Sequence, residues 1–208
     1  MNGRPESGLT AAEAVLSRAA SCRTWSQLAE AARLCTACPD LVVSRSSVVV
    51  GDAPHGCRLV LIGEAPGAEE DISGRPFVGR SGRLLDELLD GAGLDRGEIA
   101  VLNVVKCRPP RNRTPRSAET RNCSGWLNRQ LDLLGAELIC TLGLSATQHL
   151  LGRGLRLATA RGRVHQAPAG RVVVTYHPSA ALRFGPRGAP REALATDLGM
   201  IADLLAAR

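Results

Sequence analysis

Aromatic residues are scarce in this sequence and make up only 2% of its 208 residues. The whole set is Trp25, Phe77, Trp126, Tyr176 and Phe184. Apolar residues nevertheless reach 44%, so we expect a core built from Leu, Val, Ile and Ala. An aromatic ring in a loop is then less readily explained as filler. Phe77 is such a case, because it lies in a glycine-rich segment.

Long apolar runs are also absent, and no stretch approaches the roughly 18 residues that a membrane-spanning helix needs. The first residues lack the basic start and apolar centre of a secretory signal. We therefore expect no membrane segment and a cytoplasmic chain, most simply a monomer. Disulfides are rare in that compartment. The seven cysteines then have to be core residues, redox groups or metal ligands.

Lysine is almost missing, since Lys106 is the only lysine among 26 basic residues. The others are arginines, which suit bidentate contacts with phosphate. A net charge of +6 and a pI near 9.3 fit a polyanionic partner such as DNA. A composition rich in Ala, Arg and Gly can equally reflect genomic base bias, so charge alone leaves both interpretations open.

Four short apolar runs alternate with helical patterns along the chain. The runs lack polar alternation, as in strands covered on both faces, and span residues 59–63, 99–105, 138–142 and 172–176. Helices are predicted at residues 10–20, 24–34, 82–92, 118–134, 145–151 and 190–207. This order predicts an α/β fold, a three-layer αβα architecture with a short, four-stranded, mostly parallel central sheet. Residues 1–23 are expected to be an N-terminal extension, partly disordered or helical, and residues 24–208 the main domain.

The loop after the first predicted strand, GEAPGAEEDISGRPFVGRSG at 63–82, lies where parallel sheets bind ligands. It nearly matches a phosphate-binding loop, but Arg80 replaces the lysine and Pro76 removes a backbone donor. The loop is better suited to a flat, uncharged ligand. Gly63 and Gly67 would let backbone amides approach, and Phe77 would supply a stacking face. Phe77 as a simple hydrophobic plug is the alternative.

Polar groups also follow two of the other predicted strands. In NVVKCRPPRNRTP at 103–115, Asn103 can offer both a donor and an acceptor to one edge of a base-like ring. Lys106 and Arg108 belong to a basic run that fits a phosphate backbone or, alternatively, a solvated turn. In YHPSAALR at 176–183, His177 could donate to an anion, act as a base or be merely structural.

Four of the cysteines have a spacing that suits metal ligands. Cys35 and Cys38 form a half-site, and Cys107 and Cys123 could complete four thiolates. Zinc and an iron–sulfur cluster both accept four cysteines, so the spacing leaves the choice open. The remaining cysteines, which look like ordinary thiols, are Cys22, Cys57 and Cys140.

These motifs together resemble the family 4 uracil-DNA glycosylases, the iron–sulfur-containing branch of the superfamily. The resemblance runs from about Leu34 to the C-terminus. It is carried by GEAPG at 63–67, GRPFVG at 74–79, LNVVKCRPPRNRTP at 102–115 and YHPSAALR at 176–183. It implies that residues 24–208 form a monofunctional DNA repair glycosylase. Such an enzyme flips uracil out of single- or double-stranded DNA and hydrolyses its N-glycosidic bond, which leaves an abasic site.

The resemblance also implies roles for individual residues. In the base site, Phe77 would stack on uracil, Asn103 would read its polar edge, Glu70 would crowd the position of a thymine methyl, and Gly63, Ala65 and Ser179 would line the rest. In catalysis, His177 would donate to uracil O2 and Glu64 would orient water. On the DNA, Leu182 and Arg183 would enter the minor groove, and Lys106 and Arg108 would meet phosphates. Cys35, Cys38, Cys107 and Cys123 would hold a 4Fe-4S cluster.

Two other interpretations remain at this point. A covalently cross-linking relative has a longer loop with a histidine after the second strand, whereas residues 107–115 are short and lack one, so we predict turnover. A non-enzymatic iron–sulfur or zinc module that binds nucleic acid would also use four cysteines and basic loops. It would not explain Phe77, Asn103 and His177 at strand ends. Ala65 stands where the better-known branch carries a water-activating aspartate, so the group that activates water stays open.

Overall fold

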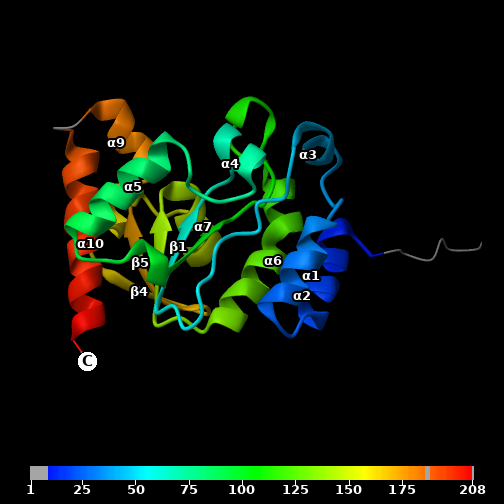
Figure 1. Ribbon diagram of the computed structural model, residues 1–208, viewed down its shortest axis with the longest axis horizontal. Helices are drawn as coiled ribbons and strands as arrows, with labels where there is room; N and C mark the ends of the chain where they lie inside the picture. The colour runs from blue at the N-terminus through cyan, green and yellow to red at the C-terminus, as the bar shows by residue number, and fades with distance from the viewer. Residues whose placement is uncertain (1–8, 186–187, 208) are drawn as a thin grey trace, which may run out of the picture.

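The computed structural model describes residues 9–185 and 188–207, and these contain one five-stranded sheet (Figure 1). The strands are β1 (Leu59–Gly63), β2 (Ile99–Asn103), β3 (Leu138–Leu142), β4 (Val164–Ala167) and β5 (Gly170–Thr175). Their order across the sheet is β2-β1-β3-β5-β4. All neighbouring pairs are parallel except β4 and β5.

The predicted four-stranded sheet was wrong by one strand. The missed strand, β4, is an antiparallel edge that pairs only with β5 among the described residues. Its sequence, Val-His-Gln-Ala, is short and polar, and no residue of it is fully buried. An edge strand needs no continuous apolar run, because part of it faces water. Its pattern therefore gave no strand signal.

The six predicted helices are all present, within two residues of their expected ends. They are α1 (Ala11–Ser21), α2 (Trp25–Arg33), α5 (Arg80–Gly91), α6 (Ser117–Leu134), α7 (Leu144–Leu151) and α10 (Ala189–Ala206). Thr24 caps α2 by accepting a hydrogen bond from the Gln27 N–H at 3.2 Å. Four helices were missed because they are too short to show a period: α3 (Pro39–Ser44), α4 (Ala68–Ser73), α8 (Leu157–Ala160) and α9 (Pro178–Phe184).

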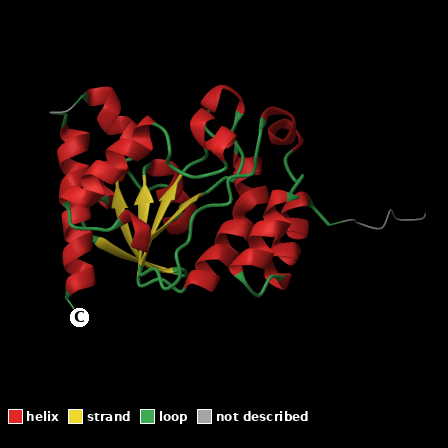
Figure 2. Ribbon diagram, in the orientation of Figure 1, coloured by secondary structure: helices red, strands yellow, loops and turns green. Residues whose placement is uncertain are grey.

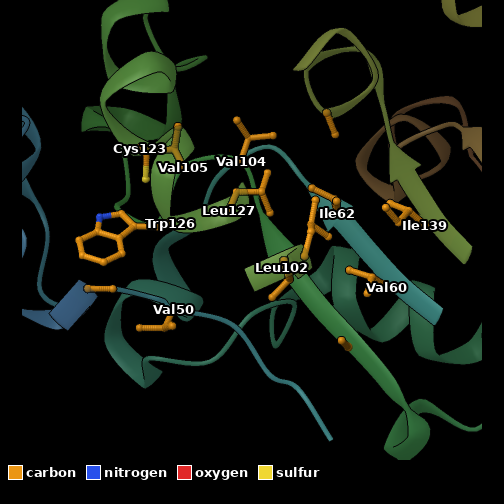
Figure 3. Packing of buried hydrophobic residues seen from close by; sticks show 14 of the residues in the cluster. Val50, Val60, Ile62, Leu102, Val104, Val105, Cys123, Trp126, Leu127 and Ile139 are labelled. Atoms are coloured by element: carbon orange, nitrogen blue, oxygen red, sulfur yellow. The ribbon is translucent and has the colours of Figure 1, made fainter. Parts of the chain in front are cut away.

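The sheet lies between two helical layers (Figure 2). Successive strand residues point to opposite faces, so Val60 and Ile62 belong to one core cluster while Leu59 and Leu61 belong to the other. Helices α6 and α7 cover the first face, α1 and α2 pack on the outer side of α6, and α5 and α10 cover the second face (Figure 1). Figure 3 shows the first cluster, where Leu127 of α6 lies beside Ile62 of β1 and Leu102 of β2. Both faces of the parallel strands are thus sealed, and their carboxyl ends remain for a ligand.

Helix α1 lies within residues 1–23, the segment expected to be an extension. It packs along α6, and Val15 and Ala19 are buried in the first core cluster. A Cβ at Gly125 of α6 would lie 2.8 Å from the Cα of Leu16, so the two helices touch backbone to backbone. The packed body of the chain therefore begins before residue 24. Residues 1–8 lie outside the described residues.

Among the described residues, the longest and most apolar helices still fall short of what a membrane crossing requires.

Candidate active site

A cavity of about 400 Å³ opens at the carboxyl ends of β1, β2, β3 and β5. Its volume is in the range of small-molecule sites. The lining includes these residues predicted to form the site: Glu64, Ala65, Glu70, Phe77, Asn103, His177 and Ser179. The topology explains the gathering, because the loops after neighbouring parallel strands meet at one edge of the sheet.

Phe77 is held in the cavity by an unusual backbone. Its φ is +54°, in the left-handed region that residues other than glycine seldom adopt. Helix α5 passes directly beneath it, and a Cβ at Gly82 would lie only 1.6 Å from the carbonyl oxygen of Phe77. Only a glycine therefore fits at position 82 while Phe77 keeps this conformation.

Asn103 and Phe77 converge on Gly63, the last residue of β1. A Cβ at Gly63 would lie 2.5 Å from Asn103 Oδ1 and 2.7 Å from Phe77 Cζ. Asn103 is 3% exposed, and within the described residues its Oδ1 has no hydrogen-bond partner. A buried amide oxygen without a partner is costly unless a ligand satisfies it. The absence of a side chain at Gly63 thus lets the Asn103 amide and the Phe77 ring both pack against the end of β1.

His177 faces the same space, with its ring centroid 5.6 Å from that of Phe77. The Ser179 backbone N–H donates to His177 Nδ1 at 3.1 Å, and the Ser179 hydroxyl lies 2.8 Å from the same atom. Desolvation lowers the pKa of His177 to about 4, so the imidazole is neutral near pH 7. Because Nδ1 accepts a hydrogen bond, the single ring proton is on Nε2. The site therefore offers a neutral N–H donor.

Glu64 supplies a half-buried carboxylate to the cavity wall. Burial raises its pKa, and a hydrogen bond with the Ser145 side chain partly offsets that rise. Ser145 stands in the first turn of α7, the helix that begins directly after β3. Its neighbour Gly143 packs against His177, since a Cβ there would lie 3.0 Å from His177 Cβ. The β3 loop therefore supports both predicted catalytic residues, and Ala65 lines the cavity beside them.

Glu70 is positioned by two nearby glycines. Its Oε1 accepts a hydrogen bond from the Gly79 N–H at 3.0 Å, and its Oε2 occupies the space that a Cβ at Gly67 would fill, at 2.6 Å. Its helix, α4, is anchored by the next residue. Asp71 is buried, and its carboxylate accepts the backbone N–H groups of Ser46 and Ser47. The carboxylate of Glu70 is thus fixed on the cavity rim.

The residues predicted to contact DNA differ in how accessible they are. Leu182 and Arg183 lie exposed on α9, and Arg108 is half-buried with its Nε bonded to Asn112 Oδ1 at 2.7 Å. The prediction that Lys106 contacts DNA was wrong. It is 1% exposed, and its Nζ donates to the backbone oxygen of Asn103 at 2.7 Å. Its ammonium points into the protein and is not available to a DNA phosphate.

Cys35, Cys38, Cys107 and Cys123, the cysteine group, gather beside the loop that follows β2. Each interacts electrostatically with at least one other member. Hydrogen bonds reach three of the sulfurs: Arg45 Nη1 to Cys107 at 2.9 Å, the Lys106 N–H to Cys123 at 3.3 Å, and Asn122 Nδ2 to Cys38 at 3.8 Å. No three His, Cys, Asp or Glu side chains of the described chain meet closely enough to hold a single metal ion.

Several cavity residues were not predicted from the sequence. Ser145 lies after a strand that was predicted, so the position of its loop could have suggested it. Pro109, Asn112 and Arg113 also line the cavity, although their motif had suggested only phosphate contacts. Gly82 had no local signal, because its role depends on a contact with Phe77.

Comparison with known proteins gives consistent matches over most of the chain. The profile of the Uracil DNA glycosylase superfamily matches residues 50–199. A Type-4 uracil-DNA glycosylase of Thermotoga maritima is 42% identical over 158 residues, which cover 75% of this chain and 82% of the relative. One from Pyrobaculum aerophilum is 41% identical over 165 residues, with 76% and 84% covered. A Type-5 uracil-DNA glycosylase of Mycobacterium tuberculosis is 33% identical over 201 residues, with 76% and 73% covered.

Proposed function

The chain belongs to the uracil-DNA glycosylase superfamily, and we infer from its relatives and its cavity that it is a hydrolytic DNA repair glycosylase that excises uracil. The observation that carries this proposal is that Phe77, Asn103 and His177 line one cavity at the carboxyl ends of the strands. These groups are distant in sequence. Together they provide a stacking face, an amide edge and a neutral donor, which is what a flipped pyrimidine requires.

We propose that Phe77 and Asn103 bind the base. A base stacked on an aromatic ring gains about 1–3 kcal/mol, which offsets part of the few kcal/mol that extrusion from the helix costs. The unpartnered Oδ1 of Asn103 would accept a hydrogen bond from uracil N3–H, and its amide nitrogen would donate to O4. Glu70, fixed at the rim by Gly79, would occupy the space that a thymine methyl needs.

Cleavage of the N1–C1′ bond leaves charge on uracil O2 and positive character on the sugar. His177 would donate its Nε2–H to O2, and this bond would strengthen as the charge develops. One such preorganised donor is worth about 2.7–4 kcal/mol in the transition state. Glu64, supported by Ser145, would orient water toward C1′ and balance the positive sugar. An aspartate at position 65 would be an alternative base, but this chain has Ala65 there. Glu64, which also lines the cavity, is therefore the carboxylate that we propose orients the water.

The DNA itself would lie across the rim formed by α9 and the loop after β2. Leu182 and Arg183 are exposed on α9 and would fill the gap left by the flipped nucleotide. Arg108 would contact phosphate. Lys106 is left out of this surface because it is buried. A cytoplasmic, monomeric enzyme acting on single- or double-stranded DNA is part of the proposal.

We propose that the cysteine group holds a 4Fe-4S cluster. Two observations support the fit: the four thiols share one neighbourhood, and N–H donors reach three of the sulfurs, as is common around cluster thiolates. The cluster would supply a covalent cross-link between the α2–α3 turn, the loop after β2 and α6. The hydrolysis itself would be carried out by the side chains of the cavity.

The test is release of free uracil from a uracil-containing oligonucleotide, measured by chromatography. Asn103→Ala should lower kcat/KM by about 10- to 100-fold, as expected for lost bonds to a buried polar edge. His177→Ala should lower kcat by about 10²- to 10³-fold. The matched controls are Asn128→Ala and His55→Ala, at exposed positions, which should retain activity. Full activity in both Asn103→Ala and His177→Ala would refute the site.

A further inference from the structure

Lys106 is the only lysine in a chain that otherwise uses arginine, and it is almost completely buried. Within the described chain it makes no ion pair with a carboxylate. Its Nζ donates to the backbone oxygen of Asn103 at 2.7 Å. A buried ammonium that lacks a carboxylate partner costs several kcal/mol unless other groups compensate the charge. The groups that compensate the charge of Lys106 should therefore indicate its role in the protein.

The cysteine group would provide that compensation as thiolates, the form in which cysteines hold a cluster. The Lys106 side chain interacts electrostatically with the sulfurs of Cys123 and Cys107, and its backbone N–H donates to Cys123 Sγ at 3.3 Å. Its carbonyl accepts the Val49 N–H at 2.8 Å, which fixes the backbone on the other side. Figure 3 places Cys123 beside Val105, the residue that precedes Lys106. The ammonium thus lies between the cysteine group and the end of β2.

The same short segment forms one wall of the uracil pocket. After Asn103 the chain stays bonded to the β1 loop, with the Val104 N–H donating to the Gly63 oxygen and the Val105 N–H to the Glu64 oxygen, both at 3.0 Å. These bonds attach residues 104 and 105 to the end of β1 and the residue after it. The carbonyl of Asn103 accepts a hydrogen bond from the Lys106 ammonium at 2.7 Å. The ammonium is thus bonded to the backbone of the residue whose amide would read the base.

We propose that Lys106 is a positioning residue that couples the cysteine group to the uracil pocket. Its ammonium fixes the backbone of Asn103 through a hydrogen bond and balances the negative charge at Cys107 and Cys123. The inference rests on the proposed function for its effect on uracil, and on the proposed cluster for the charge. Arginine could not replace it without expansion of a closed site, which fits the presence of a single lysine in an arginine-rich chain.

The experiment separates the hydrogen bond from the charge with two variants. Lys106→Met removes both at nearly constant volume, whereas Lys106→Gln removes the charge and keeps a donor on a side chain one bond shorter. Free uracil is titrated as a competitive inhibitor, and the midpoint potential of the cluster is measured in a redox titration. Arg18→Met, at an exposed position on α1, controls for the loss of one positive charge.

We expect Lys106→Met to weaken uracil binding by about 10- to 100-fold, the value of a hydrogen bond from a charged donor. Lys106→Gln should recover most of that loss. Both variants should lower the midpoint potential, because a nearby positive charge favours electron addition, and Arg18→Met should leave it unchanged. If Lys106→Met fails to fold, Lys106→Gln still tests the charge balance, through a lowered midpoint potential at near wild-type uracil affinity.

Other results would overturn the inference. Wild-type uracil affinity in Lys106→Met would remove the link to Asn103, and equal losses in the Met and Gln variants would reduce Lys106 to a structural residue. An unchanged potential in both would remove the charge balance, as would a colourless wild-type protein that still releases uracil. A wild-type protein that releases no uracil would instead refute the proposed function.

Discussion

Gly82→Ala tests the contact on which the position of Phe77 depends. The added Cβ would lie 1.6 Å from the Phe77 oxygen and 2.9 Å from its Cα, and both neighbours are backbone, which cannot rotate away. Either α5 or the Phe77 turn must therefore move by more than an ångström. Overpacking of this kind typically costs about 1–3 kcal/mol of stability. A displacement of about 1 Å near a reacting centre can cost about 100-fold in rate.

The assay is single-turnover release of uracil, with a thermal melt on the same sample. Gly82→Ala should release uracil about 100-fold more slowly while retaining a cooperative melt at lower temperature. Gly91→Ala is the matched control, because Gly91 lies in the same helix and a Cβ there would meet nothing within 4 Å. It should be neutral or stabilising by about 0.5–1 kcal/mol. If Gly82→Ala acts through the ring, adding Phe77→Ala should give less than the sum of the two losses. Wild-type rate and stability in Gly82→Ala would refute the packing argument.

The remaining predictions concern pH, the proposed cluster and the product. The pKa of His177 is lowered to about 4, so a profile of kcat/KM against pH should show no inflection near 6.5, the ordinary histidine value. The pKa of Glu64 is raised, so activity should be present above that pKa and be lost as pH falls through it; the same acid limb in Glu64→Gln would exclude Glu64 as its source. Cys35→Ser should lower visible absorbance, melting temperature and DNA affinity together, and an unchanged melting temperature with lost activity would point to a redox role instead. Incubation with uracil-containing single strands should leave no protein–DNA band on a denaturing gel, since a persistent band would indicate the covalent relative.

The sequence predicted the parts of the fold that depend on local pattern. The four predicted strands, β1, β2, β3 and β5, are continuous apolar runs, and each predicted helix is long enough to show a period. β4 was missed because an edge strand tolerates His165 and Gln166. The gathering of Asn103 and His177 could be expected, because the carboxyl ends of parallel strands meet at one edge.

Lys106 shows why the rest could not be predicted. Its neighbours in sequence, Arg108, Arg111 and Arg113, are basic and lie at or near the surface, so the whole run suggested a phosphate-binding loop. The backbone turns between residue 103 and residue 107 so that this one ammonium points inward. The amino-acid sequence of this run does not distinguish a buried cation from an exposed one. The same limit applies to Gly82, whose constraint comes from a contact through space with Phe77.

The charges of the cavity explain why a basic protein would bind a neutral base there and not a phosphate. Two carboxylates, Glu64 and Glu70, line the described cavity, and His177 is neutral. The cation at its rim, Arg113, is held by Glu119 through two hydrogen bonds at 2.6 and 2.8 Å. A triphosphate would therefore meet uncompensated negative charge, which argues against the phosphate-loop interpretation of residues 74–81. The exposed arginines can attract the DNA backbone at longer range, while the cavity admits only the uncharged part of the nucleotide. This separation of charge favours extrusion of the base alone, with its sugar and phosphate left at the rim.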